Sequence, residues 1–598
     1  MADLVIQRVV MPPERQLARL YCRFAPGSGG RGRRSVVLPG GTCLRTDTYF
    51  NGFFEGYWRK YTRLGRLDLR VRVSGAGTLR LYRRSPGGGR GLLRQVTFAG
   101  KDREVSLEAP PAETGLLYFE VRARSRRLLL HRAEWVARDV EARPARLVAG
   151  YCTFNREPLL IRNVAALLKD PDVAAALSRV VVVDQGGRKV RAHPAYPTLA
   201  AGARDRLRVV EQDNFGGAGG FTRCLLEALG TAGATHVLLM DDDAAVEPES
   251  LLRAAAFLTL ARGDLAVGGH MLDLLRPREL VEAGSRCRPE LVAIEPPVRH
   301  RVDRPGGLEP FLDVRHGDYN GWWFFALPLA LLGRVGLPLP LFLRGDDTEF
   351  GYRLLRSGVP TVALPGVGVW HEPFEPKGRG HYPYYETRNL LAVGALHFPP
   401  PPAGVIARRF LSRLLEELLA YDYYEAWLLC EAAADYLRGP ETLRAPPGAA
   451  HRRLLTAREE MTAGTLARAG GLPTVTPPPP PPGRLARRAR LLGHLVRNLV
   501  RPSPPPAARP RHAIPGADER WYGVAGADVV AVDDAHRPDL VVLRRSRGRF
   551  VRLLGRGLWL ALRLLGSYRR AVRRWRQGYP ALTTRPFWRE HLSKGSGG

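Results

Sequence analysis

The first part of the chain alternates apolar and polar residues in short runs separated by Gly- and Pro-rich turns. Three of these runs are LDLRVRVS (67–74), GTLRLYRR (77–84) and LLYFEVRAR (116–124). Alternation with a period of two is typical of strands that bury one face. Many short strands joined by turns predict an all-β domain over residues 1–143, with the architecture of a β-sandwich.

From residue 144 the apolar runs become continuous, which indicates strands buried on both faces. They are RLVAGYCTF (146–154), RVVVVDQGG (179–187), RLRVVEQDNFGGAGG (206–220) and THVLLMDDD (235–243). The intervening segments have the length and composition of helices. The pattern predicts a Rossmann-like α/β domain over residues 144–400, with a mostly parallel sheet and right-handed crossovers.

Beyond residue 401 the apolar residues recur at helical spacing, so residues 401–598 are expected to form a helical region. Pro-rich linkers are expected at 473–483, where the run 477–482 would be a stiff polyproline spacer, and at 501–512. Two stretches, 484–500 and 549–577, are basic and amphipathic. Such helices suit an anionic membrane surface, but they suit equally a helix that packs on its own protein with its arginines in water.

An aromatic stretch, DTYFNGFFEGYWRKYT (47–62), stands out within the β-rich part. A stripe of this kind belongs more often to a hydrophobic core than to a binding site. The alternative is a surface for sugar stacking or assembly, built from Tyr49, Phe50, Tyr57 and Trp58 beside basic residues. We favour the core.

The main information in the composition is the net charge, which bears on the kind of partner. The chain of 598 residues is long enough for three or more domains, and 91 Lys and Arg against 58 Asp and Glu give a formal charge of +33. An anionic partner is therefore expected: nucleic acid, anionic lipid or a phosphorylated substrate. No run of about 18 uncharged apolar residues occurs, which argues against a membrane span, and the first residues, MADLVIQRVVMPPERQ, lack the pattern of a signal peptide.

The six cysteines are dispersed and show neither a CxxC pair nor the spacing of a disulfide scaffold. They are Cys22, Cys43, Cys152, Cys224, Cys287 and Cys430. This pattern favours a reduced, cytosolic setting.

Three consecutive carboxylates, Asp241, Asp242 and Asp243, end the apolar strand at 235–243. Ligands of open α/β sheets bind at the carboxyl ends of the strands, and carboxylate oxygens suit Mg²⁺ or Mn²⁺ that also holds phosphates. His371, at the end of the strand-like run in VGVWHEP (367–373), could complete a site begun by Asp241 and Asp243. The alternative is an acidic turn that caps a helix beginning near Pro248.

Three polar turns at the ends of the other strands fit the same purpose. TFNR (153–156) could hold a base or ribose while Arg156 reaches phosphate, DQGG (184–187) begins with Asp184, and NFGGAGG (214–220) begins with Asn214 and leads into a helix. Each of these turns alone could be an ordinary loop.

A second acidic pair, Asp346 and Asp347, lies downstream in PLFLRGDDTEFGYR (340–353). The pair could be the cap and first-turn charge of a helix. In an inverting transfer, however, a carboxylate separate from the metal cluster takes the proton of the attacking hydroxyl. Trp322 and Trp323 of YNGWWFF (319–325) would offer flat faces for a sugar.

These stretches occur in an order that resembles the polymerising galactofuranosyltransferases of mycobacteria and related actinobacteria. The resemblance is carried by TFNR, VVDQGGRKV, QDNFGGAGGFTR, LLMDDD, VGGHML, DYNGWWFF, PLPLF with DDTEFGYR, PTVALPGVGVWH and YYETRN. It is dense over residues 145–395, and DTYFNGFFEGYW and YLRGPETLR extend it in both directions.

The resemblance implies a metal-dependent, inverting GT-A transferase of glycosyltransferase family 2. Such an enzyme would extend a lipid-linked galactan from UDP-galactofuranose as a homotetramer, peripheral on the cytoplasmic face of the plasma membrane. By resemblance, Arg156, Asn214, Asp184, Asp241 and Asp242 would face the donor, and Asp241, Asp243 and His371 would hold Mn²⁺ or Mg²⁺. Asp347 would be the general base, with Trp322, Trp323, Asp346 and Tyr319 beside the acceptor.

Two positions depart from the family pattern, both on the expected acceptor side. Gly345 stands where a tryptophan is expected, and Ser285 stands where an acidic residue is expected. The same fold acting on another nucleotide sugar, for a different cell-wall or teichoic-type glycan, is therefore the nearest alternative. A nucleic-acid-binding protein is disfavoured because no recognisable module carries the charge. The complete set of Asp241, Asp243, Asp347 and His371 argues against an inactive carbohydrate-binding scaffold.

Overall fold

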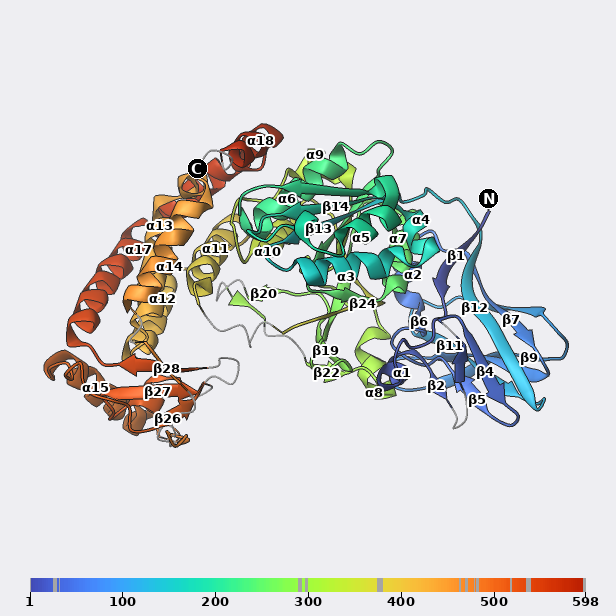
Figure 1. Ribbon diagram of the computed structural model, residues 1–598, viewed down its shortest axis with the longest axis horizontal. Coiled ribbons are helices and arrows are strands. Elements are labelled where there is room, and N and C mark those ends of the chain that lie inside the picture. Colours follow the sequence, from blue (N-terminus) through green and yellow to red (C-terminus); the bar gives the residue numbers. More distant parts are fainter. Residues whose placement is uncertain are drawn as a thin grey trace.

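A computed structural model gives the structure of residues 2–594 outside the segments 25–28, 32, 289–292, 296–298, 374–379, 462–463, 468–471, 478, 480–482, 517–518 and 534–538. Most of the expected polyproline spacer at 477–482 lies outside these described residues. Three parts follow one another in space: a β-rich part at one end, an α/β part in the middle and a largely helical part at the other end (Figure 1).

Residues 2–140 form a sandwich of two antiparallel six-stranded sheets, as predicted. One sheet has the order β10-β7-β12-β4-β3 with β1 on β12, and the other β2-β5-β11-β8-β9 with β6 on β11. The strands of the first sheet are β1 (Ala2–Arg8), β3 (Gly29–Arg31), β4 (Ser35–Pro39), β7 (Arg66–Ser74), β10 (Arg103–Ala109) and β12 (Arg127–Val140). Those of the second are β2 (Arg23–Phe24), β5 (Cys43–Arg45), β6 (Phe53–Phe54), β8 (Gly77–Arg84), β9 (Arg90–Phe98) and β11 (Leu116–Ala123).

The aromatic stretch at 47–62, which includes helix α2 (Glu55–Tyr61), is core rather than surface. Tyr49, Phe50, Tyr57 and Trp58 are all at most 2% exposed. Their partners lie in the central domain: the Phe50 ring is 5.5 Å from Trp370, and the Trp58 ring is 5.0 Å from Phe257. The stretch therefore forms a shared core between the sandwich and the α/β domain, and the alternative of a sugar-stacking surface is wrong.

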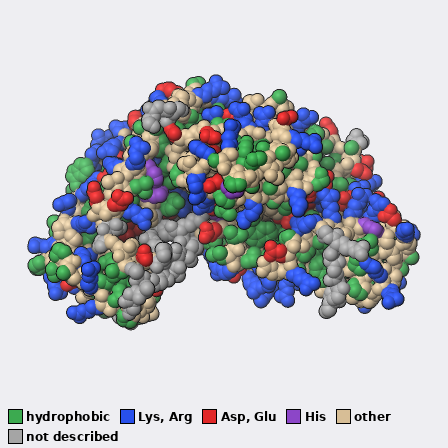
Figure 2. Space-filling model, viewed as in Figure 1, with side chains coloured by type: hydrophobic (Ala, Val, Ile, Leu, Met, Phe, Trp, Pro, Cys, Tyr) green, Lys and Arg blue, Asp and Glu red, His purple; other side chains and the backbone are tan. Residues whose placement is uncertain are grey.

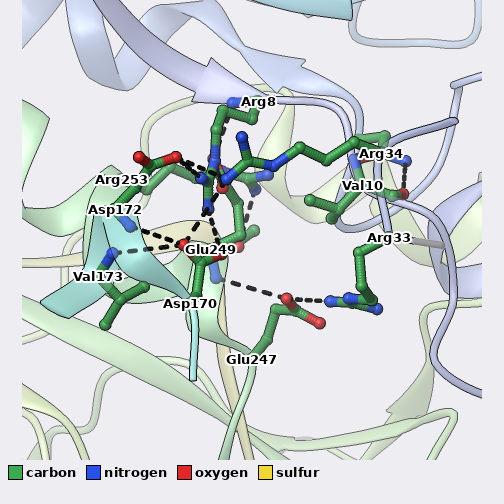
Figure 3. A network of polar contacts seen from close by, with 12 residues as sticks. Arg8, Val10, Arg33, Arg34, Asp170, Asp172, Val173, Glu247, Glu249 and Arg253 are labelled. Carbon is green, nitrogen blue, oxygen red and sulfur yellow. Dashed lines mark hydrogen bonds and ion pairs between the residues drawn. The ribbon is translucent and has the colours of Figure 1, made fainter. Parts of the chain in front are cut away.

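A network of ion pairs reinforces this junction (Figure 3). Arg8 of β1 donates to Glu249 at 2.6 Å and to Asp172 at 2.5 Å, and its Nη2 lies 3.1 Å from Asp170. Arg33 pairs with Glu247. Because Glu247 and Glu249 follow the acidic triplet by only a few residues, the sandwich holds the segment that carries the triplet.

The central domain is built on a ten-stranded mixed sheet. Its order is β15-β14-β13-β16-β23-β18-β19-β22, with β24 beside β18 and β17. The strands are β13 (Leu147–Thr153), β14 (Leu177–Asp184), β15 (Leu207–Glu211), β16 (His236–Asp241), β17 (Ala245–Val246), β18 (Ala266–Asp273), β19 (Glu279–Glu282), β22 (His300–Arg301), β23 (Phe325–Pro328) and β24 (Thr361–His371).

The four strands predicted from the apolar runs, β13 to β16, pair in parallel as expected. The sheet as a whole is less parallel than predicted, because β23 lies antiparallel between β16 and β18. The chain between β18 and β23 is a long excursion rather than a helical crossover, so it can return in the opposite direction.

Helices cover both faces of this sheet (Figure 1). They are α3 (Glu157–Leu168), α4 (Pro171–Ala176), α5 (Tyr196–Ala203), α6 (Gly216–Leu229), α7 (Pro248–Thr259), α8 (Pro305–Leu308), α9 (Leu332–Val335) and α10 (Asp346–Arg356).

The C-terminal part is mainly helical, as expected. Its helices are α11 (Tyr382–His397), α12 (Ala403–Leu419), α13 (Tyr423–Arg438), α14 (Pro447–Met461), α15 (Arg484–Val500), α16 (Trp521–Val524), α17 (Arg547–Leu582) and α18 (Arg585–Ser593). It also contains a four-stranded sheet that was not predicted, in the order β25 (Thr465–Ala467), β28 (Asp539–Arg544), β27 (Val529–Asp533) and β26 (Ala513–Pro515).

The two basic amphipathic stretches are the helices α15 and α17, and α17 has one apolar face packed on its own protein and other apolar residues exposed. Its Leu560, Leu564 and Trp575 are buried at 1% or less, whereas Trp559 and Leu562 on another face are 53% and 67% exposed. Helix α15, which packs against α17, exposes Leu485 and Val500 at 80% and 66%. Arg and Lys side chains lie over every part of the face shown in Figure 2, so the positive charge is not confined to these helices. Within the described ranges, no helix is both long enough and apolar enough to span a membrane.

The last helix, α18, turns back onto the central domain (Figure 1). Trp588 is 1% exposed, and its indole Nε1 donates to the carbonyl oxygen of Pro338 at 2.8 Å. The His591 ring lies 5.3 Å from the ring of Phe215, the residue that begins the glycine-rich helix α6. The end of the helical part therefore supports a loop of the predicted site.

Candidate functional site

The carboxyl ends of β16 and β24 bring Asp241, Asp243 and His371 together. His371 Nε2 lies 3.0 Å from Asp243 Oδ1 and 3.6 Å from Asp241 Oδ2. One possible ligand atom from each of these three residues lies within 4.8 Å of the other two. The short strand β17 pairs with β24 directly beyond the triplet, through Ala245 with Trp370, and so fixes the two strand ends relative to each other.

The hydrogen bonds of His371 fit the role of a metal ligand. Its Nδ1 lies 2.7 Å from the carbonyl oxygen of Glu372. Because a carbonyl oxygen can only accept, Nδ1 must donate, and the neutral ring then presents the lone pair of Nε2 to the two carboxylates. A backbone acceptor on the second ring nitrogen is the usual support of a metal-binding histidine. Two carboxylates and an imidazole suit Mn²⁺ well, and Mg²⁺ less well because it prefers oxygen ligands.

Asp242 points away from this cluster and into the protein. Its carboxylate accepts from the Thr153 hydroxyl at 2.7 Å, and its backbone carbonyl accepts from Asn163 at 2.8 Å. Burial, with repulsion from Asp243 and Asp241, raises the pKa of Asp242 to about 7. The interpretation of the triplet as a helix cap is wrong, because the N-cap of α7 is Glu247, whose side chain accepts from the amide of Glu249.

The predicted donor-side residues surround the same edge of the sheet. We call Asp241, Asp243 and His371 the cation cluster, because together they could bind a metal ion. Arg156 forms an ion pair with Asp243, so its guanidinium lies beside the cation cluster. Asn214 accepts from the amide of Gly216 at 2.9 Å and shapes the entry into α6. Asp184 is fully buried and accepts from the amides of Gly186 and Val190 at 3.1 and 2.7 Å. Asp184 thus holds the loop after β14, and a direct contact with a donor stays a prediction.

Asp346 and Asp347 occupy the first turn of α10, while the N-cap is Gly345 in the left-handed conformation with φ 76°. Burial, together with repulsion by Asp347 and Asp241, raises the pKa of Asp346 to about 8. A Cβ on Gly217 of α6 would lie 3.0 Å from Asp346 Oδ2, so this carboxylate faces the glycine-rich helix and the cation cluster. Burial also raises the pKa of Asp347, although hydrogen bonds from Thr348 and the charge of Arg344 oppose that rise.

A further carboxylate, Glu282 at the end of β19, lies near Asp347 and was not predicted. Burial raises the pKa of Glu282 to about 7, a hydrogen bond from the Ser285 hydroxyl opposes the rise, and the charge of Asp347 adds to it. The charges of Glu282 and Asp347 also act on the buried hydroxyl of Tyr319. Glu282 and Ser285 line a cavity of about 350 Å³. Glu282 therefore links this cavity to Asp347, whose charge acts on it.

The two tryptophans expected to stack on a sugar are largely buried, at 4% exposure each. Trp322 packs edge-on against Phe221 and Phe350, with ring centroids 5.3 and 6.0 Å apart. Trp323 donates from Nε1 to the carbonyl oxygen of Gly269 at 2.9 Å, and its ring lies 6.4 Å from His371. Both rings form the floor of the site, and contact with an acceptor stays a prediction.

The loop before α10 is strained, and helix α11 holds it. Phe342 and Arg344 have φ values of 72° and 63°, in a region that non-glycine residues seldom adopt. The side-chain amide of Asn389, fully buried, donates to the carbonyl oxygens of Leu343 and Arg344 at 2.9 and 2.6 Å. Arg388 donates to the carbonyl oxygen of Leu341 at 2.8 Å. Asn389 ends the stretch YYETRN of the resemblance, but no local pattern indicates its role, because its partners lie more than forty residues earlier in the chain.

Three family models match the chain in succession. "Galactofuranosyltransferase 2 N-terminal" matches residues 6–138, "Glycosyltransferase like family 2" matches 149–382, and "Galactofuranosyltransferase-2, domain 3" matches 406–594. The second of these matches contains the whole cluster of Asp241, Asp243, His371, Asp346 and Asp347.

Two curated relatives are similar along their whole length. Galactofuranosyltransferase GlfT2 of Mycobacterium tuberculosis is 30% identical, with 99% of this chain and 98% of the relative aligned. GlfT2 of Mycolicibacterium smegmatis is 31% identical over 98% and 96% of the two chains. Among solved structures, a mannosyltransferase from Pyrobaculum calidifontis aligns with 16% identity over 60% of this chain and 90% of that one. Its TM-score is 0.30, too low to carry an argument.

Proposed function

Because the chain belongs to the galactofuranosyltransferases of glycosyltransferase family 2, we propose that it transfers galactofuranose from UDP-galactofuranose to a hydroxyl of a growing, lipid-linked cell-wall galactan. The observation that carries this proposal is that two sets of carboxylate residues lie next to each other at one edge of the sheet. Asp241 and Asp243 with His371 form a cation cluster, and the Asp346–Asp347 pair lies beside it.

Asp241, Asp243 and His371 would hold Mn²⁺ or Mg²⁺, which supplies positive charge that stabilises the diphosphate as it leaves. Arg156 lies next to Asp243 and is placed to contact a donor phosphate. The N-terminus of α6 adds the positive end of a helix dipole, which favours the same anion. These residues bind and orient the donor.

Asp347 is the proposed general base of an inverting transfer. Its carboxylate takes the proton of the acceptor hydroxyl while that oxygen bonds to the anomeric carbon, and the bond from this carbon to the diphosphate oxygen breaks in the same displacement. Burial favours this role, because a raised pKa makes the carboxylate a stronger base. Asp346 lies on the side of the cation cluster, where it would help to orient the acceptor. Glu282, Ser285 and Tyr319 would contact the acceptor on the opposite side.

A donor screen tests the proposal directly. Purified protein with Mn²⁺ and a galactan acceptor is expected to release UDP faster from UDP-galactofuranose than from UDP-galactopyranose or other nucleotide sugars. Preference for another nucleotide sugar would identify the enzyme with a different cell-wall or teichoic-type glycan. Gly345 and Ser285 lie on the expected acceptor side, so they bear on the identity of the acceptor rather than on that of the donor.

Replacing Asn389 with Ala is expected to lower turnover, because it frees the strained loop that carries the proposed base. The side chain holds the carbonyls of Leu343 and Arg344, and loss of a buried hydrogen-bond partner costs about 1–3 kcal/mol. Transfer kinetics and chemical denaturation check this result. Turnover should fall about tenfold or more at saturating donor, since a small misplacement of a catalytic group is costly, while Mn²⁺-dependent UDP affinity changes little.

Asn498→Ala is the matched control for Asn389→Ala. Asn498 is also fully buried, and it donates to the carbonyl oxygen of His494 at 2.8 Å within α15. It should lose stability without losing turnover per folded molecule. Equal turnover in the two variants would show that Asn389 contributes only to stability.

We also propose that α15 and α17 place the enzyme on the cytoplasmic face of the plasma membrane. The exposed apolar residues Trp559 and Leu562 lie on a helix rich in arginine. Binding to phosphatidylglycerol vesicles should weaken as salt rises, since each basic residue near an anionic surface contributes about 1 kcal/mol that salt screens. Sedimentation at low and high ionic strength measures this dependence. Trp559→Ser with Leu562→Ser should reduce binding further, and equal binding to neutral vesicles would contradict the proposal.

Assembly into a tetramer is part of the same proposal and is tested by light scattering.

A further inference from the structure

A groove lined by arginines lies between the edge of the central sheet and the last helix. Arg179 of β14, Arg208 of β15 and Arg223 of α6 line one side, and Arg585 and Arg589 of α18 line the other. We call this the arginine groove. Its volume is about 690 Å³. In Figure 1, α18 lies next to the central domain.

The charge of the arginine groove is only partly balanced. Its acidic residues are Glu211 and Glu227, and both Arg208 and Arg223 pair with Glu227, at 2.6 and 2.9 Å. Within the part of the chain that the structure describes, Arg179, Arg585 and Arg589 have no ion pair. Arg585 and Arg589 stand one helical turn apart on α18, where like charges repel. An anion between the two sides would relieve this repulsion.

The two sides of the arginine groove are fixed in position. Helix α18 is anchored through buried Trp588 and Leu592, so Arg585 and Arg589 project from a docked helix rather than from a loose segment. The opposite side belongs to the edge strand β15 and its neighbour β14. Guanidinium groups bind phosphate with paired hydrogen bonds, and the volume admits a ligand larger than one phosphate.

We propose that the arginine groove binds a phosphate-bearing anion, held between the sheet edge and α18. The ligand chemistry is a phosphate ester or a diphosphate, whose source is either a soluble compound or the headgroup of an anionic lipid. Such a ligand would also fasten α18 to the domain. Helix α18, which lines the arginine groove, also packs against Phe215 at the start of α6. The same helix therefore supports both the arginine groove and the loop that leads into α6. This anion binding does not depend on the proposed sugar transfer.

Calorimetric titration with inorganic pyrophosphate, in EDTA and low salt, tests the proposal. The test variant is Arg585→Gln with Arg589→Gln, and Arg179→Gln probes the opposite side. Each should bind pyrophosphate about tenfold or more weakly than the natural protein, which corresponds to about 1.4 kcal/mol. These side chains are partly or fully exposed, so the variants are expected to fold, and their melting temperatures without ligand check this.

The matched control is Arg124→Gln with Arg126→Gln, two exposed arginines of the sandwich. The control should bind pyrophosphate as the natural protein does. If pyrophosphate binding is unchanged in the groove variants but their binding to phosphatidylglycerol vesicles falls below that of the control, the ligand is a lipid headgroup. If neither binding falls below that of the control, the proposal is overturned.

Discussion

Asp347→Asn should bind UDP and Mn²⁺ almost normally while transfer falls by about 10²- to 10⁴-fold, the usual contribution of a positioned base. The substitution keeps the size and polarity of the side chain and removes only the proton acceptor. Asp347 is not one of the three residues of the cation cluster, and its charge acts on Glu282 and Tyr319, so donor affinity has no reason to change. Single-turnover transfer together with UDP titration separates the two effects.

The pH profile offers a second measurement on the same variant. Burial raises the pKa of Asp347, so the proton-accepting form is lost as pH falls through a value above that of an exposed aspartate. The acidic limb of turnover should therefore lie above about pH 4, the ordinary value for Asp, and the residual activity of Asp347→Asn should lack it. Asp346→Asn should be milder. A larger loss in that variant would assign the base to Asp346, and near-normal transfer by Asp347→Asn would refute the assignment.

Asp243→Ala should abolish the effect of Mn²⁺ on UDP affinity. Asp243 contacts His371 at 3.0 Å and pairs with Arg156, so it joins the cation cluster to the proposed phosphate contact. Changes in residues that merely support metal ligands cost about 10- to 100-fold in affinity, so loss of a direct ligand should cost at least the upper figure. Calorimetric titration of Mn²⁺, and of UDP with and without EDTA, measures both effects.

Asp242→Asn is the control within the same triplet. Its carboxylate binds Thr153 and points away from the cluster, so Mn²⁺ affinity should remain within about tenfold of normal. If UDP binds the natural protein equally well with and without EDTA, the cation site plays no part in donor binding. If Asp242→Asn loses as much Mn²⁺ affinity as Asp243→Ala, Asp242 is a ligand as well.

The features that the sequence predicted well are those with a local pattern. Continuous apolar runs identified β13 to β16, and polar residues directly after them identified the edge where Asp241 and Asp243 meet His371. Strand ends can be read locally because chain direction alone places them at one edge of a parallel sheet.

The features that were missed depend on contacts between distant segments. Glu282 lies near Asp347 only after β19 has joined the sheet, and Asn389 reaches the loop before α10 from the following helix. Tertiary packing also leaves Trp322 and Trp323 only 4% exposed, which the sequence did not indicate, and their contact with an acceptor stays a prediction. In the small C-terminal sheet, β25 and β26 are three residues each, too short for alternation to show, whereas the apolar runs of β27 and β28 have the length of strands and were overlooked.

The docking of α18 also constrains how the protein is made. Trp588 lies 3.8 Å from the position of a Cβ on Gly219, so residues from the end of the described chain complete the packing around the glycine-rich helix. On the ribosome, the central domain emerges well before α18. The packing around the start of α6 is therefore complete only after that helix has been synthesised. A premature stop codon shortly before residue 585 would leave every proposed catalytic residue in place and still give a defective enzyme. A bulky fusion placed directly after α18 carries the same risk.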